Sequence, residues 1–354
     1  MLIIFIFSAT ALFLTIFNSL TMKVVKNQPS HISGKVSILI PMRNEEINVV
    51  GCLDSIINQK GLTDFEIIVL NDHSTDSTAS KLTAYPQIKL IEGATLPSGW
   101  LGKVWACHQL SQAATGETLV FLDADVRLTD NAIASAINKM GNWSFISPYP
   151  KQYSIGLPEK IFQPLLHWSW LSSVPLLIAQ KFDIKSMSVA NGQFFVVNKK
   201  AYESCGGHLE IKGEVLDDLA LSKSLLEFGF KGGVAEGGKV AICTMYTTFN
   251  QLIKGYQKSL WSAFGGVAGS IFVSLLLLAT GVITFVFALA GSKLAAISFL
   301  FIYLSRLISS VRSGESAITA IAHPIAVLIF IYINIYSWIG KVSGNLTWRD
   351  RVIS

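Results

Sequence analysis

The stretch TLVFLDAD, residues 118–125, decides the fold, because it joins an apolar run directly to two acidic residues. Leu119–Leu122 has the composition and length of a buried strand, and Asp123 and Asp125 follow where that strand would leave the core. In an extended segment, side chains at i and i+2 point to the same side, so the two carboxylates repel each other unless a cation lies between them. Carboxylate oxygens suit hard ions such as Mg²⁺ or Mn²⁺, which leave coordination positions open for phosphate oxygens. The stretch therefore predicts a metal site for a diphosphate, although the DxD tripeptide alone is a weak indication.

Short apolar runs alternate with helical patterns on both sides of this stretch, between residues 35 and 250. The helical patterns include residues 45–59 and 102–115. Strands that alternate with helices predict an α/β fold with a mostly parallel sheet, in which ligands bind at the carboxyl ends of the strands. The predicted strands are Val36–Ile40, Phe65–Leu70, Ile88–Ile91, Leu119–Leu122 and Phe194–Val197.

Acidic and polar loops recur at the predicted carboxyl ends of these strands. PMRNEE (41–46) follows the first strand, and NDHSTDST (71–78) follows the second. A further acidic segment, EVLDD (214–218), opens a helical pattern. Surface charge explains any one of these segments, but it explains poorly why all of them fall at one edge of one sheet. That edge is therefore the predicted binding site.

Four side chains near this edge suit particular tasks, and each has a second interpretation. Asp72 is placed to accept a hydrogen bond from a base or a ribose hydroxyl, or it caps an Asx turn. Lys103, in SGWLGK near a helix start, suits a phosphate, or it is a solvated surface lysine. Asp217 and Asp218 form a second acidic pair, in which one residue suits a general base, or the pair simply caps a helix.

The two ends of the 354-residue chain are too apolar for an ordinary soluble protein. Because a membrane span needs about 20 apolar residues, we expect one transmembrane helix in residues 1–22 and about three in residues 266–340. The three later apolar runs are residues 266–290, 294–311 and 316–340. A signal peptide is the alternative for the first run, but a basic region before the run and a small-residue cleavage site after it are both missing.

Charge and cysteine content bear on location and partners. Lys23, Lys26 and Lys35 follow the first apolar run, so the positive-inside rule places the middle region in the cytoplasm, and we expect an integral protein of a bacterial-type plasma membrane. The net charge of +5 fits basic residues beside an anionic leaflet better than it fits a nucleic-acid partner. The four Cys are scattered without metal spacing, which fits a reducing compartment.

Residues 155–182 interrupt the middle region with an apolar stretch broken by Pro, in which Trp168 and Trp170 suit a bilayer interface. We expect this stretch to dip into the cytoplasmic leaflet and admit a lipid, and a pair of buried core helices is the alternative. The basic tail, residues 341–354, conflicts with three preceding spans, because an odd number of spans would put Arg349 outside. Either one run is re-entrant or interfacial, which we favour, or the tail is outside despite its charge.

Five motifs in one order make the segment from about Val36 to Phe264 resemble the family 2 glycosyltransferases of the GT-A fold. The motifs are a PxxNEE loop at Pro41, an ND-x-S-x-D-x-T loop at Asn71, a GK segment ending at Lys103, the DxD at Asp123 and a late DDxxL motif at Asp217. Three stretches are similar to the membrane-bound subgroup associated with hopanoid and carotenoid glycosylation, namely PSGWLGKVWAC (97–107), ANGQFFVVNKKAYESCGGH (190–208) and TWRDR (347–351). The resemblance implies a Rossmann-like GT-A catalytic domain over residues 35–264 with flanking transmembrane helices.

The resemblance also implies roles for single residues. Asp218, with Asp217 beside it, would be the catalytic base, and Asp125 would hold a divalent metal, Mg²⁺ or Mn²⁺. Gln193 and Trp261 are candidate contacts to the sugar or the acceptor. His208 is a third candidate, because it follows a Gly pair that suggests a tight turn and lies ten residues before Asp218, and a structural hydrogen bond is the alternative. The donor-binding residues would be Pro41, Arg43, Glu45, Asp72, Lys103 and Asp123.

The implied activity is an inverting transfer of a hexose from a nucleotide sugar, such as a UDP-sugar, to a polyisoprenoid, carotenoid or hopanoid-like lipid. Processive relatives carry a QxxRW motif, whereas residues 257–261 read QKSLW, with Leu260 at the Arg position. This departure favours a single transfer over the synthesis of a polysaccharide. A ceramide-like or glycerolipid acceptor is an alternative, and so is a non-catalytic membrane subunit that uses the same fold.

Overall fold

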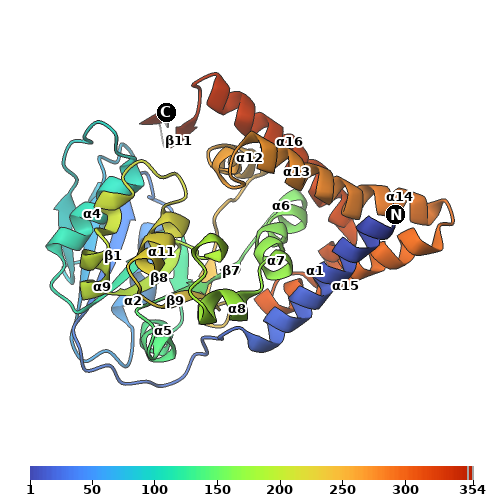
Figure 1. Cartoon of the computed structure of the whole chain (residues 1–354). Coiled ribbons are helices and arrows are strands. Elements are labelled where there is room, and N and C mark those ends of the chain that lie inside the picture. The colour runs from blue at the N-terminus through green and yellow to red at the C-terminus, as the bar shows by residue number, and fades with distance from the viewer. Residues whose placement is uncertain (349–350, 353–354) are drawn as a thin grey trace. The chain divides into compact units, whose positions relative to one another are not determined.

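The structure, a computed structural model, describes residues 1–348 and 351–352 and consists of two compact units (Figure 1). The sheet unit comprises residues 23–151 and 178–244. The helical unit comprises residues 1–22, 152–177 and the described residues from 245 onwards. Each unit is therefore assembled from segments that lie far apart in the sequence.

The sheet unit is built on seven strands in the order β3-β2-β1-β4-β8-β6-β9. β1 pairs in parallel with β2 and β4, and β2 with β3, whereas β8 runs antiparallel to both of its neighbours. The sheet is mostly parallel, which confirms the predicted fold class. The strands are β1 (Val36–Met42), β2 (Phe65–Asn71), β3 (Ile88–Glu92), β4 (Thr118–Leu122), β6 (Phe145–Tyr149), β8 (Phe194–Asn198) and β9 (Gly232–Glu236).

The helices of the sheet unit follow the expected alternation, with one difference at a boundary. The predicted helix 45–59 begins only at Val49, because the backbone N–H groups of Glu45 and Glu46 donate to side chains of the 71–78 loop instead of continuing a helix. The helices are α2 (Val49–Ile57), α3 (Thr78–Leu82), α4 (Gly102–Ala113), α5 (Ala132–Met140), α9 (Lys199–Ser204), α10 (Gly207–Glu210) and α11 (Asp217–Glu227). The helix α8 (Leu176–Lys181) belongs to the sheet unit from residue 178 onwards.

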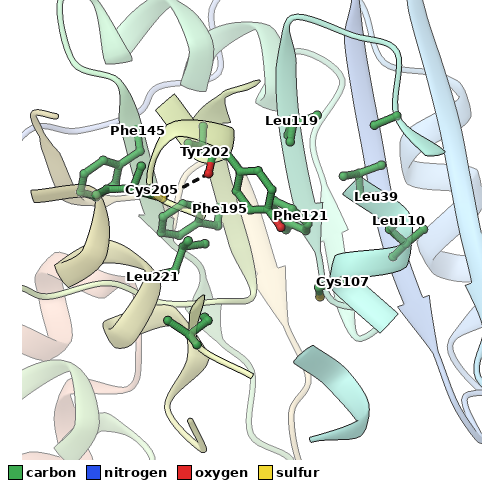
Figure 2. Close-up of a cluster of buried hydrophobic side chains, with 14 of the residues drawn as sticks. Leu39, Cys107, Leu110, Leu119, Phe121, Phe145, Phe195, Tyr202, Cys205 and Leu221 are labelled. Carbon is green, nitrogen blue, oxygen red and sulfur yellow. Dashed lines mark hydrogen bonds between the residues drawn. The ribbon is translucent and has the colours of Figure 1, made fainter. Parts of the chain in front are cut away.

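A buried apolar cluster fixes one face of the sheet beneath α4, α9 and α11 (Figure 2). Phe121 of β4 and Tyr202 of α9 pack with ring centroids 5.5 Å apart, and Phe145 stacks on Phe195 at 5.6 Å. Burial of each such aromatic side chain contributes about 1.5–3 kcal/mol. The ends of β4 and α4 are thereby held in fixed positions at the sheet edge where Asp123 and Lys103 emerge.

The helical unit contains four helices that are long and apolar enough to cross a membrane, in agreement with the four predicted runs. They are α1 (Leu2–Thr21), the continuous segment Val267–Leu289, α15 (Lys293–Ser313) and the segment Ala317–Val342, which includes α16 (His323–Val342). The second of these consists of α13 (Val267–Leu277), the π-helical η3 (Leu278–Ile283) and α14 (Thr284–Leu289). Part of the tail pairs as β11 (Thr347–Trp348) with β12 (Arg351–Val352), and Arg349 lies outside the described residues.

The interrupting stretch forms short helices, of which α6 (Leu157–Phe162) and α7 (Pro164–Ser173) belong to the helical unit together with α12 (Phe249–Gln257). Pro175 has no N–H to donate to the carbonyl of Leu171, so the helix breaks there. Asn18 of α1 hydrogen-bonds the backbone groups at this break. Its Nδ2 donates to the carbonyls of Leu171 and Val174 at 2.8 and 2.7 Å, and its Oδ1 accepts from Leu176 N. The first apolar helix is thus tied to α7 by buried polar contacts.

Candidate active site

Arg43 ties together the loops that follow β1 and β2. Its guanidinium donates to the backbone carbonyl of Asp72 at 2.7 Å and to that of His73 at 3.3 Å. Asn44 and His73 both have positive φ, so each loop turns sharply away from its strand. The two loops therefore form one structure at the carboxyl edge of the parallel strands.

The Glu45 backbone continues this connection, since its N–H donates to Thr78 Oγ1 at 2.8 Å. The Glu45 carboxylate accepts from Asn48 Nδ2 at 2.8 Å. Asp72 is 4% exposed, and the α3 helix begins only at Thr78, whose N–H donates to Asp76. Asp76 thus makes the Asx turn that leads into α3.

Lys103 lies between two acidic residues from different elements. At the start of α4, its Nζ is 2.9 Å from Asp123 Oδ1 and 3.8 Å from Asp217 Oδ2. Burial alone would lower the pKa of Lys103, but Asp123 and Asp217 outweigh burial and hold the pKa well above its ordinary value. The lysine is therefore charged at all physiological pH values, and its partly exposed side chain is held between two carboxylates.

Asp125 lies where the chain enters β5 (Val126–Leu128), which pairs antiparallel with β10 (Ala241–Cys243). Burial and the charge of Asp123 raise the pKa of Asp125 to about 6, against a hydrogen bond from the Cys243 side chain. The Oδ1 atom of Asp125 is buried without a hydrogen-bond partner among the described residues. An orphaned carboxylate oxygen with a raised pKa is the environment that a cation would relieve.

Asp217 and Asp218 form the first turn of α11, and their carboxylates differ in partners. Asp218 Oδ2 accepts from the backbone N–H of Gly192 at 2.8 Å, and Oδ1 accepts from Leu219 N at 2.8 Å. Burial, and then the charge of Asp217, raise the pKa of Asp218 to about 6. Asp218 is thus ionised but basic near neutral pH, as a general base should be.

A pocket joins six of the twelve predicted site residues, and we call it the acidic pocket. Pro41, at the end of β1, forms part of its wall. Arg43, Glu45, Asp72 and Asp125 lie on the adjoining loops. The pocket is lined by Pro41, Lys103, Cys107, Phe121, Leu122, Asp123, Gly192, Phe195, His208, Asp217, Asp218 and Leu221.

The three predicted sugar or acceptor contacts are placed differently. His208 is 3% exposed and lines the acidic pocket. Gln193 precedes β8, and its carbonyl accepts from Asp123 N at 3.1 Å. Trp261 belongs to the helical unit, where its Nε1 donates to the carbonyl of Lys258.

Sequence reasoning missed two residues that support the acids. At Gly192, a Cβ would lie 3.3 Å from Asp218 Cβ and 3.4 Å from Lys103 Nζ, so the missing side chain makes room for both groups. Cys243 hydrogen-bonds Asp125, although nothing in its sequence context separates it from an ordinary buried cysteine. A glycine two residues before a strand was a usable signal for the first residue.

Comparison with known proteins agrees with this geometry. Residues 37–206 match Glycosyl transferase family 2, so the chain carries a domain of that family. The chain is similar to 4,4'-diaponeurosporenoate glycosyltransferase of Staphylococcus aureus strain bovine RF122 / ET3-1, with 28% identity over 335 residues that cover 90% of this chain and 88% of the relative. The enzyme of strain USA300 is also 28% identical, over 340 residues with the same coverage of each chain.

A solved structure supports the fold independently. The mannosyltransferase PcManGT from Pyrobaculum calidifontis, solved in complex with GDP-Man and Mn²⁺, matches with a TM-score of 0.54 and 17% identity. The match covers 98% of this chain and 96% of that chain. It confirms the GT-A-like fold expected from the order of the motifs.

Proposed function

We propose that this protein is an inverting glycosyltransferase that moves a hexose from a nucleotide sugar, a UDP-sugar, to a polyisoprenoid, carotenoid or hopanoid-like membrane lipid. The proposal is carried by the acidic pocket, in which Lys103 bridges Asp123 and Asp217 beside Asp218 within a glycosyltransferase domain. The lipid class is supported by the similarity to a diaponeurosporenoate glycosyltransferase and by four helices apolar enough to cross a membrane.

The donor is bound by residues at the ends of β1, β2 and β4. Pro41 and Asp72 frame the nucleotide, while Arg43 and Glu45 hold the two loops in register. Asp123 receives the ribose, and Lys103 moves from Asp123 to the diphosphate while it stays near Asp217. A permanently charged lysine at a helix start suits that exchange, because the helix N-terminus and the ammonium attract the same anion.

Asp125, with Asp123 beside it, is the proposed holder of Mg²⁺ or Mn²⁺. Its unpartnered buried oxygen and raised pKa fit a cation, whereas no group of three or more His, Cys, Asp or Glu in the described part of the chain is arranged as a metal cage. A site with few protein ligands suits a hard ion that shares its coordination with phosphate. Such an ion supplies positive charge beside the departing diphosphate when it is bound.

Asp218 is the proposed general base. It accepts the proton of the acceptor hydroxyl while the hydroxyl oxygen bonds to the anomeric carbon, and the bond from that carbon to the diphosphate oxygen breaks. One displacement inverts the anomeric centre. The N–H groups of Gly192 and Leu219 hold the carboxylate in place, and Asp217 stays paired with Lys103. An acceptor that is already a carboxylate needs no base, so the dependence on Asp218 reports the acceptor group.

The proposed organisation places residues 1–22 and 266–340 in a bacterial plasma membrane and the catalytic domain, residues 35–264, in the cytoplasm. The orientation is supported by Lys23 and Lys26 directly after α1. The stretch 155–182 is the proposed entry for the lipid, because it supplies apolar helices within the catalytic domain's sequence.

The test uses purified protein in detergent with bacterial lipid extract, Mn²⁺ or Mg²⁺ and labelled UDP- and GDP-sugars. The expected result is label in the organic phase from one donor, lost with chelator and in Asp125→Ala. Asp130→Asn is the matched control, since Asp130 is an exposed carboxylate that pairs with Lys60. No label from any donor would overturn the transferase assignment, and label only in water-soluble products would overturn the lipid acceptor.

A further inference from the structure

His208 belongs to a chain of hydrogen bonds that ends on a backbone carbonyl. Ser111 Oγ donates to the carbonyl of His108 at 2.7 Å, and the Tyr202 hydroxyl donates to Ser111 Oγ at 3.1 Å. The Tyr202 oxygen is also 2.8 Å from His208 Nδ1 and accepts from the His208 backbone N–H at 3.0 Å. All of these groups are buried or lie on α4, α9 and α10 of the sheet unit.

The direction of every proton in this chain follows from its last member. A carbonyl only accepts, so Ser111 must give its single proton to His108. Ser111 Oγ is then an acceptor for the proton of Tyr202, and the Tyr202 oxygen has only lone pairs left for His208. The Nδ1 atom of His208 must therefore carry the proton. Burial lowers the pKa of His208 to about 4, so the ring is neutral near pH 7 and its other nitrogen, Nε2, is bare.

The bare nitrogen belongs to a residue that lines the acidic pocket. Within the described part of the chain His208 Nε2 makes no hydrogen bond, and the ring is fixed edge-on against Phe121 with centroids 4.8 Å apart. Gly207, at φ +54°, allows this arrangement, since a Cβ there would lie 2.4 Å from the Tyr202 ring. Apart from the Lys103 ammonium and the weakly donating Cys107 thiol, the other polar side chains of the pocket are carboxylates, which accept hydrogen bonds as the imidazole does.

We propose that His208 is a fixed hydrogen-bond acceptor that recognises one hydroxyl group of the donor hexose, and that Tyr202 and Ser111 are positioning residues that set its tautomer. A pocket rich in acceptors complements a ligand rich in O–H donors, as a hexose is. The inference rests on the proposed glycosyltransferase function and adds a determinant of sugar specificity to it. A sugar that lacks this hydroxyl leaves a buried acceptor unpaired, and such a loss weakens binding more than a missing apolar contact does.

Binding of nucleotide sugars to the full-length protein in detergent tests the recognition without requiring an acceptor lipid. His208→Asn keeps a donor for Tyr202 but cannot reach the position of Nε2, whereas His208→Gln can place an amide oxygen there. We expect His208→Asn to weaken binding of the transferred UDP-sugar about fivefold, the typical worth of a neutral hydrogen bond, with unchanged binding of UDP. His208→Gln should weaken binding of the UDP-sugar less than His208→Asn does. Equal weakening of UDP and of the UDP-sugar would show a structural role and overturn the proposal.

A series of donors, each deoxygenated at one carbon, identifies the hydroxyl. One deoxy-sugar should bind the wild-type protein about fivefold more weakly than the complete sugar does. His208→Asn should bind that deoxy-sugar and the complete sugar equally well, because the two changes remove the same contact. If every deoxy-sugar binds more weakly by the same factor in the wild type and in His208→Asn, His208 does not recognise a hydroxyl group. Sugar binding that His208→Asn leaves intact overturns only this inference, whereas absence of any nucleotide-sugar binding overturns the proposed function as well.

The tautomer is measured directly with ¹⁵N-labelled histidine, using the His208→Asn spectrum for assignment. We expect protonated Nδ1 and bare Nε2 in the wild type. Ser111→Ala removes the acceptor of the Tyr202 proton, which can then turn to Nδ1 and leave Nε2 protonated, with weaker sugar binding although His208 is intact. Protonated Nε2 in the wild type would overturn the proposal whatever the binding data show.

Discussion

Asp217→Asn should move the acid limb of the pH–rate profile while leaving the base itself in place. The pKa of Asp218 is raised to about 6 from 3.8, first by burial and second by the neighbouring charge of Asp217. Burial is the larger cause, and for the neighbouring charge of Asp217 we take an order of magnitude of about one pKa unit, or roughly 1.4 kcal/mol. The asparagine removes that repulsion, and Lys103, released from Asp217, lowers the Asp218 pKa further in the same direction.

If the acceptor group is a hydroxyl, the acid limb of the pH–rate profile should move to lower pH in Asp217→Asn. A base must be unprotonated, so the rate falls as the pH falls through its pKa. With a pKa of about 6, roughly a tenth of Asp218 is active at pH 5, and with a pKa lower by about one unit roughly half is active. The ratio of kcat/KM at pH 5 to that at pH 7.5 should therefore rise about fivefold in Asp217→Asn. Taking this ratio within each variant cancels any loss of absolute activity.

The assay is transfer of labelled sugar to lipid between pH 4.5 and 8, at saturating Mn²⁺ so that metal binding does not titrate. Asp218→Asn is the reference variant. Its pH–rate profile should lack the acid limb, and its rate should be about 10²–10⁴-fold lower than that of the wild type. An acid limb near pH 6 that Asp217→Asn leaves unmoved would refute Asp218 as the titrating base. Full activity of Asp218→Asn would show instead that the acceptor arrives as a carboxylate.

Three further outcomes are expected. Lys103→Met should weaken UDP binding at least tenfold by calorimetry while Mn²⁺ affinity holds or rises, because it removes the cation from the acidic pocket; a parallel fall of both would contradict this role. Asp125→Asn should abolish metal-dependent activity, yet raise the thermal stability of the metal-free protein at pH 7.5. The folded-state pKa of Asp125 is raised to about 6, so its ionised carboxylate costs about 1 kcal/mol or more of stability above pH 6, and an unchanged melting temperature would contradict this. Asn18→Leu should destabilise the protein by about 3 kcal/mol in detergent, since it strands two carbonyls and one N–H at the α7 break, whereas Thr10→Leu on the exposed side of α1 should be neutral.

The sequence predicted the parallel part of the fold well because local pattern and position coincide there. β1 and β2 are almost continuously apolar, as strands covered on both faces must be, and the loops after them carry the polar residues. The same rule predicted where Asp123 would emerge. It could not predict the limits of α2, because that boundary is set by side chains of the 71–78 loop, which reach Glu45 and Glu46 only in the folded chain.

The expectation that site residues follow the carboxyl ends of strands failed at β8, which runs antiparallel to β4. An antiparallel strand brings its amino end to the edge at which its parallel neighbours end. Gly192 and Gln193 therefore reach the site although they precede their strand, and Gln193 accepts from Asp123 N. The direction of β8 is set by long-range pairing, and a strand's own residues do not encode it. Sequence reasoning named Gln193 only through the resemblance and passed over Gly192.

The raised pKa values of Asp125 and Asp218 have related causes, and these bear on the order of binding. Each carboxylate is buried beside a second acid, Asp123 in one case and Asp217 in the other, and Lys103 lowers the pKa of both. Four ionised carboxylates against one lysine leave this region with a net charge of −3, which repels a diphosphate. A divalent cation at Asp125 would reduce that repulsion and free Lys103 to leave Asp123 for the donor. Metal should therefore bind before the nucleotide sugar, and UDP affinity measured without metal should fall as the pH rises through 6, because ionisation of the two acids adds to the repulsion.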